Sequence, residues 1–161
     1  MKKGQKRSIV APVLEIGKSI LFWGGKTVGE PSILTLVERQ TRYTVTEKLV
    51  EKKAEYVNQA VLECMKPYPI KSITADNGNE FSSLSKIEGL DVYFAHAYSS
   101  YERGTNKNFN GLLREFIPKG SSLKELKPTL LEDYTKAINE RPRRIHSYQS
   151  AKKLFELTQT A

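Results

Sequence analysis

The chain has a single cysteine, Cys64, so it cannot form an internal disulfide. The surrounding YVNQAVLECMK has the spacing of the apolar face of a helix, which predicts that Cys64 packs in a core. A protein without disulfides is typical of a reducing compartment, so we expect a cytoplasmic location. Long hydrophobic runs are also missing, since ILTLV and runs like it are far too short to cross a membrane. The start, MKKGQKRSIVAPV, lacks the continuous apolar segment of a signal peptide.

Acidic residues are too few to balance the basic ones. The 161 residues include 26 lysines and arginines but 18 aspartates and glutamates, which gives a formal charge of +8 and a pI of about 9.5. Such an excess indicates an anionic partner, most often a nucleic acid, with a merely basic surface as the alternative. Hydrophobic residues make up 39% of the chain, which is typical of a folded domain and excludes a disordered tail.

The order of predicted elements is that of one α/β domain. Strands are rich in β-branched and alternating apolar residues, whereas helices repeat apolar residues every three to four positions. The segments with strand character are 18–23, 33–39, 42–50, 70–75 and 90–95. A helical stripe lies between the third and fourth of these, and the chain after the fifth is mostly helical. We therefore expect a mixed five-stranded sheet flanked by helices.

Serine and proline mark the expected helix ends. Ser121 or Ser122 is placed to cap a helix that Pro128 kinks or divides, and Ser150 is placed to cap a last short helix. No repeat or linker divides the sequence. We expect a basic arm over 1–17, one core domain over 18–158 and a short tail over 159–161.

Five segments together resemble one known family. They are ILTLVERQTRY, TADNGNEF, YFAHAYSSYERGTN, NGLLREFIPKG and NERPRRIHSYQSAKKLF. In this order they resemble the ribonuclease-H-like catalytic core of DDE transposases and retroviral integrases, and most closely bacterial insertion-sequence transposases of the IS-thirty type. The resemblance implies a ribonuclease-H-like fold over most of the chain and an ancestry in DNA transposition or integration.

The resemblance also implies a site made of three carboxylates. In that family an Asp on the first strand, an Asp after the fourth and a Glu on the helix after the fifth hold two metal ions, Mg²⁺ or Mn²⁺, ~3.5–4 Å apart. Asp76 in TADNGNEF matches the second acid. Lys26 in WGGKT and Lys107 in GTNKNFNG stand at the first and third. Three carboxylates would carry −3, whereas two lysines and one aspartate carry +1.

These two lysines remove the donor chemistry that a metal needs. A charged lysine has no lone pair, and it repels a cation by about 1 kcal/mol per unit charge at ~4 Å in water and about 4 kcal/mol at an effective dielectric of 20. We therefore expect no bound metal and no catalysis, with Lys26 and Lys107 neutralising Asp76. Glu102 and Glu30 are the acids nearest in sequence that could replace a lost ligand. The weak metal-dependent nuclease or strand transferase that this would give is an alternative.

Basic and amide side chains elsewhere are candidates for DNA contacts. The arginine fork suits phosphate, and asparagine at a helix start either contacts a DNA backbone or caps the helix. A solvated basic surface is the alternative for the arginines. The candidates are Arg141, Arg143, Arg144, Asn106, Asn108 and Lys119.

Two binding roles are consistent with an inactive core. The first is DNA binding that is mostly electrostatic and weakly specific, because the chain starts about where the core starts and no helix-turn-helix module is expected ahead of it. The second is a protein-interaction role, as a homodimer or as a partner that regulates an intact transposase.

Overall fold

The computed structural model describes residues 14–23, 29–67, 70–75, 78–94 and 104–160. For 14–23, 104–107 and 159–160 it describes the backbone but not the side chains. Among the described residues, no helix is both long enough and apolar enough to cross a membrane.

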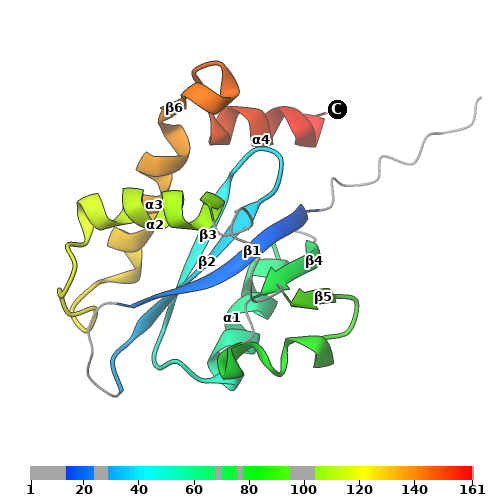
Figure 1. Ribbon diagram of the computed structural model, residues 1–161, viewed down its shortest axis with the longest axis vertical. Coiled ribbons are helices and arrows are strands. Elements are labelled where there is room, and N and C mark those ends of the chain that lie inside the picture. The colour runs from blue at the N-terminus through cyan, green and yellow to red at the C-terminus, as the bar shows by residue number, and fades with distance from the viewer. Residues whose placement is uncertain (1–13, 24–28, 68–69, 76–77, 95–103, 161) are drawn as a thin grey trace, which may run out of the picture.

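Five strands form one mixed sheet, which confirms the predicted architecture (Figure 1). They are β1 Leu14–Trp23, β2 Ser32–Glu38, β3 Thr44–Leu49, β4 Ile70–Ala75 and β5 Asp91–Phe94. Their spatial order is β3-β2-β1-β4-β5. The first three pair antiparallel, whereas β4 runs parallel to β1 and β5 parallel to β4. Parallel pairing needs a crossover, and the helix between β3 and β4 supplies it.

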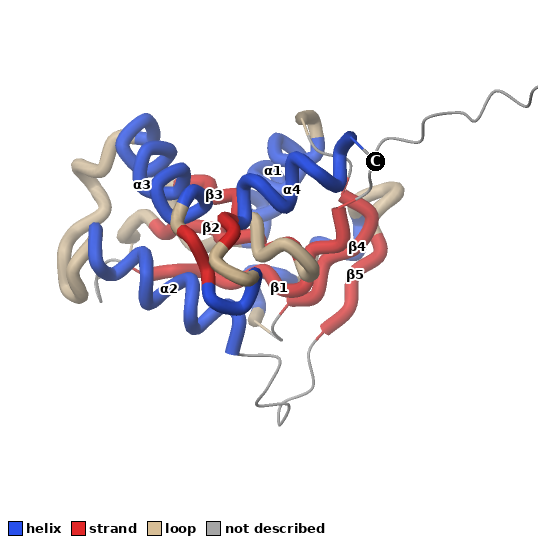
Figure 2. Tube along the Cα trace, turned by 90° about the horizontal axis from the view of Figure 1, so that it is seen from above, coloured by secondary structure: helices blue, strands red, loops and turns tan. Residues whose placement is uncertain are grey.

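In the part of the chain that the structure describes, four α-helices cover the sheet. They are α1 Ala54–Met65, α2 Gly104–Phe116, α3 Pro128–Glu140 and α4 Ala151–Thr160. Two short 3₁₀ turns, Asn79–Phe81 and Leu84–Lys86, lie between β4 and β5. Figure 2 shows α2 on one side of the sheet and α1 with α4 on the other.

The central strand β2 supplies both layers of the core. All seven of its residues are buried. Leu34 and Leu36 pack in a cluster with residues of α1 and with Phe155 of α4. Ile33 and Val37 point the other way and pack with residues of α2 and α3. Successive residues of a strand point to opposite faces of the sheet, and both faces of β2 are buried. The apolar run is therefore continuous rather than alternating.

The limits of two elements differ from the prediction. β1 begins at Leu14, so the last four residues of the segment assigned to the basic arm, 14–17, belong to the sheet. At the other end α4 continues to Thr160, past the expected boundary at 158. The sequence of Leu14–Gly17 has no strand pattern of its own. These residues form a strand because they pair with β2 and β4.

The predicted cap at Ser121 or Ser122 is wrong. The helix begins at Pro128, which occupies its first turn, with Lys127 as the N-cap. Proline suits this position because its missing N–H would have no helical partner. Ser122 Oγ instead donates to Glu30 Oε2 at 3.3 Å and accepts from the Lys124 N–H at 3.2 Å.

The segment between α3 and α4 forms a small hairpin that the sequence did not predict. Its strands, β6 Pro142–Arg143 and β7 Gln149–Ser150, pair antiparallel around a 3₁₀ turn at Arg144–His146. The predicted cap of the last helix is confirmed, since Ser150 Oγ accepts from the Lys153 N–H at 3.1 Å.

Candidate functional site

The site that the family resemblance implies maps to one edge of the sheet. Strands β1, β4 and β5 run in the same direction, so their carboxyl ends meet there. In the register Ser19 of β1 lies beside Ala75, the last residue of β4, and Asp76 follows Ala75 in the chain. Helix α2 also contacts β1. The fold therefore brings the three relevant elements together.

Five of the ten predicted site residues have no described side chain. Lys26, Asp76 and Glu102 lie outside the described residues. Asn106 and Lys107 are the third and fourth residues of α2, where the backbone alone is described. A contact between either lysine and Asp76 thus stays a prediction.

The strand register bears on which β1 residue neighbours Asp76. Trp23, the anchor of the WGGKT motif, is four residues beyond Ser19, about 13 Å at ~3.3 Å per residue, and pairs with Ser32 of β2. The β1 residues level with the end of β4 are those around Ser19. That stretch, Ile16–Ile20, has the sequence IGKSI and contains no acid. The assignment of Lys26 to the first-acid position rested on motif spacing, but either assignment leaves the position without a carboxylate.

Helix α2 also lacks an acid at the position of the third carboxylate that the resemblance implies. Its first turn contains no acidic residue. A lysine there opposes the positive end of the helix dipole, where a carboxylate would be favoured.

Glu30 does not serve as a replacement ligand. Its side chain is buried at 8% exposure, and its carboxylate lies 3.6 Å from Lys124 Nζ and accepts the Ser122 hydroxyl. It precedes Ser32, which pairs with Trp23 rather than with the part of β1 beside Ala75. These contacts fix the segment that leads to α3. Among the described residues, no group of three His, Cys, Asp or Glu side chains could hold a metal ion.

The three candidate arginines have different surroundings. Arg141 donates to Glu115 Oε2 at 2.8 Å and lies 5.5 Å from the centre of the Phe116 ring, so it joins α3 to α2. Arg143 is half-buried, and its Nε and Nη2 atoms are shielded from water with no hydrogen-bond partner. Burial, and then the charge of Arg42, lower the pKa of Arg143. Arg144 is exposed.

The other two described candidates lie on α2 and after it. Asn108 is exposed on the second turn of α2, and Lys119 is exposed in the turn that follows the helix. They do not belong to the hairpin that carries the arginines. The cationic candidates therefore come from different elements of the fold.

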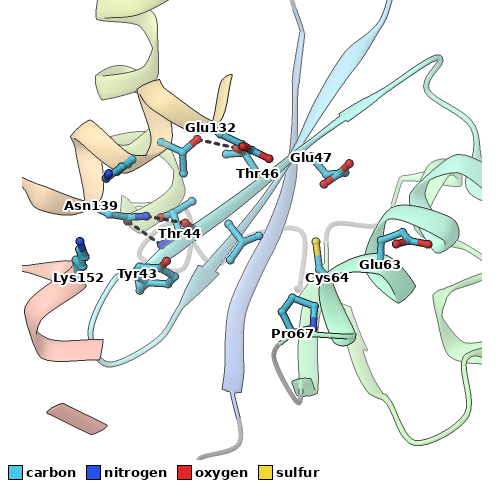
Figure 3. Close-up of a pocket in the computed structure, with 13 residues that line it drawn as sticks. Tyr43, Thr44, Thr46, Glu47, Glu63, Cys64, Pro67, Glu132, Asn139 and Lys152 are labelled. Carbon is cyan, nitrogen blue, oxygen red and sulfur yellow. Dashed lines mark hydrogen bonds between the residues drawn. The ribbon is translucent and has the colours of Figure 1, made fainter. Parts of the chain in front are cut away.

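A cavity of about 570 Å³ lies along the outer edge of β3, between α1 and α3 (Figure 3). No sequence pattern predicts this cavity, because its walls come from four separate elements. Its lining includes Thr44, Thr46 and Glu47 of β3, Glu63 and Cys64 of α1, Glu132 and Asn139 of α3, and Lys152 of α4.

The groups in this cavity are poorly suited to catalysis. Burial, with the nearby charges of Glu47 and Glu63, raises the pKa of Cys64 from 9.0 to about 12, so the thiol is protonated and a weak nucleophile. Burial and then the charges of Glu132 and Glu63 raise the pKa of Glu47 above 4.5. The prediction that Cys64 packs in the core is confirmed, since the residue is 5% exposed.

The sequence of the chain is similar to those of known transposases. No protein-family model matches the chain. It is 93% identical over 138 residues to a probable transposase for insertion-like sequence element IS1161 of Streptococcus salivarius, covering 86% of this chain and 40% of that protein. It is 33% identical over 148 residues to transposase InsI for insertion sequence element IS30A of Escherichia coli strain K12, covering 86% and 39%. The chain thus spans about two fifths of the length of these relatives.

The fold is similar to that of solved integrase cores. The catalytic core domain of BIV integrase superposes with a TM-score of 0.65 at 14% identity, covering 89% of this chain and 94% of that one. An integrase in a simian T-cell lymphotropic virus intasome gives a TM-score of 0.64 at 12% identity, covering 92% and 60%. The ribonuclease-H-like fold predicted from the sequence is therefore confirmed.

Proposed function

Because this chain carries a DDE transposase/integrase-like domain of the IS30 type, we propose that the domain binds DNA but neither cuts nor joins it. The observation that carries this proposal is the missing pair of carboxylates. Neither the part of β1 level with the end of β4 nor the first turn of α2 contains an acid. This holds whether the first-strand position is Lys26 or a residue near Ser19.

The residues at this edge do not fit a two-metal centre. Two ions ~3.5–4 Å apart need several hard oxygen ligands, and the three family positions retain only Asp76. Lysine nitrogen is a donor without a lone pair when charged, so Lys107 adds repulsion instead of a ligand. We assign no catalytic step to the site.

Charge supports the DNA-binding half of the proposal. The formal charge of +8 favours association with a polyanion, and the relatives are transposases of insertion sequence elements. Affinity of this kind falls with salt, with a slope of about −0.9 in log K against log [salt] for each phosphate neutralised.

One observation favours a second role, pairing with another protein chain. β5 is an edge strand of the sheet, and its Tyr93 and Phe94 are 60% and 40% exposed. An open strand edge is a template for pairing, so a homodimer or a complex with an intact transposase would form here. A monodisperse monomer with no such partner would contradict this second role.

A three-part measurement tests the proposed function. Thermal unfolding with Mg²⁺ or Mn²⁺ should show no stabilisation of the wild type, whereas a metal at ~100 times its Kd would add about 2.7 kcal/mol. Binding of a labelled duplex should weaken steeply between 50 and 200 mM KCl. A nicking assay should show no product. Metal stabilisation and nicking that both vanish in Asp76→Asn would overturn the inactive assignment and favour rescue through Glu102.

A further inference from the structure

The hairpin Pro142–Ser150 exposes two large apolar side chains to solvent. Ile145 and Tyr148 are each 70% exposed, the highest values among the large hydrophobic residues that the structure describes. They lie on the loop between β6 and β7, which protrudes between α3 and α4 at the top of Figure 1. Burial in the domain therefore does not explain their apolar character.

The backbone of this hairpin holds Tyr148 in a disfavoured conformation. Ser147 and Tyr148 both have positive φ, 53° and 65°. Neither is glycine, so each left-handed residue is strained by its Cβ. The Tyr148 N–H donates to the Arg143 carbonyl at 2.8 Å, which closes the turn. Strain of this kind persists where the surrounding contacts enforce it, and it is concentrated at functional sites.

The charge around these residues is positive and not neutralised from within the hairpin. The segment from Arg141 to Ser150, RPRRIHSYQS, contains no acid. Of the neighbouring acids, Glu115 is paired with Arg141, and Glu140 lies 3.2 Å from Lys152. Arg143 stands at the base of the hairpin with two shielded nitrogens that have no acceptor.

We propose that this hairpin binds unpaired DNA, with the Tyr148 ring stacked on an exposed base and Arg144 on an adjacent backbone phosphate. Arg143 supplies a fixed positive charge beneath them. Single-stranded nucleic acid presents both flat apolar base faces and phosphates. An aromatic ring on a loop beside arginines can bind both of these features. In a duplex the base faces are covered by their neighbours, so Tyr148 has no equivalent partner there. This inference rests on the DNA-binding half of the proposed function.

Fluorescence anisotropy with three labelled probes tests the inference. The probes are a 20-nucleotide single strand, a blunt duplex of the same sequence, and that duplex with an unpaired 3′ extension. Tyr148→Ala should weaken binding to the two probes with unpaired bases by about 5- to 100-fold and to the blunt duplex less than twofold. Tyr148→Phe should bind all three like the wild type, because stacking does not need the hydroxyl.

Matched variants separate stacking from charge and from general exposure. Arg144→Ala should weaken all three probes to a similar degree, because every probe has phosphates. Val50→Ala removes a side chain of similar exposure, 69%, outside the hairpin and should change nothing.

The outcomes distinguish this inference from the proposed function. If none of the probes binds, DNA binding itself is wrong. If the duplex binds but Tyr148→Ala has no effect, or affects duplex and single strand equally, base stacking alone is overturned. A change of oligomeric state in Tyr148→Ala without a change in DNA affinity would make the hairpin a protein contact and would also overturn the inference.

Discussion

The side-chain amide of Asn139 pairs with the backbone of Thr44 as a neighbouring strand would. Asn139 Oδ1 accepts from the Thr44 N–H at 3.0 Å, and Nδ2 donates to the Thr44 carbonyl at 2.8 Å. One helical turn earlier in α3, the hydroxyl of Thr135 lies 2.6 Å from the hydroxyl of Thr46 in β3. Helix α3 thereby satisfies the outward-facing backbone groups of Thr44, at the start of the strand that lines the cavity of Figure 3. At this residue the edge of β3 has no backbone group left for pairing with a further strand.

Asn139→Ala should strongly destabilise the domain. The change leaves a buried N–H and a buried carbonyl of Thr44 without partners, a loss of about 2–4 kcal/mol. The melting temperature should fall by roughly 5–10 °C for a chain of this size. Asn79→Ala, at an exposed position, is the matched control and should melt like the wild type. Equal melting of the two variants would show that the paired amide contributes nothing.

Arg143→Met should raise the melting temperature while weakening DNA binding. A half-buried guanidinium with shielded, unpaired nitrogens and a second arginine nearby is costly, and methionine keeps much of its apolar length. Thermal unfolding and anisotropy on the same sample measure both effects. A lower melting temperature would mean that Arg143 stabilises the fold, against this prediction.

Arg141 and Arg144 should differ when each is changed to alanine. Arg141 is held by Glu115 and Phe116, so its loss should mainly lower stability by up to about 1 kcal/mol, the usual range of an exposed ion pair. Loss of Arg144 should instead weaken DNA binding and reduce the salt slope by about 0.9. Titrations at several salt concentrations distinguish the two, and identical salt slopes would contradict this division of roles.

Introducing two acids tests which β1 position belongs to the proposed site. One double variant combines Lys107→Glu with Lys26→Asp, as the motif spacing indicates. The other combines Lys107→Glu with Lys18→Asp, as the strand register indicates, because position 18 is the β1 partner of Val37. Val37 packs in the cluster that includes α2. We expect Mn²⁺-dependent thermal stabilisation in the register-based pair and less in the other. Stabilisation in the motif-based pair alone would favour Lys26 as the first-acid position.

Cys64 should react slowly with iodoacetamide. With a pKa of about 12 instead of 9.0, its thiolate fraction at pH 8 is roughly a thousandfold smaller than that of an ordinary thiol, and the side chain is buried. The rate should rise sharply in urea as the domain unfolds. Fast labelling of the folded protein would show that the cavity opens to solvent at Cys64.

Sequence patterns predicted the sheet well because each strand carries its own signal. The buried run ILTLV became the central strand β2. The start of α3 was predicted wrongly, because Pro128 begins the helix instead of kinking or dividing it. The pattern failed where order comes from neighbours, since Leu14–Gly17 is a strand only through its pairing with β2 and β4. The hairpin of β6 and β7 was missed for the same reason, because its strands are two residues each.

The sequence by itself determined the order of elements, the family and the residues that stand at the motif positions, because these depend on residue identity and spacing along the chain. Tertiary structure alone decided which residues meet. It placed Ser19, not Trp23, beside the end of β4, and it engaged Arg141 with Glu115 while leaving Tyr148 exposed. The physical reason is that register and burial are set by pairing between segments far apart in the chain, which local spacing does not encode.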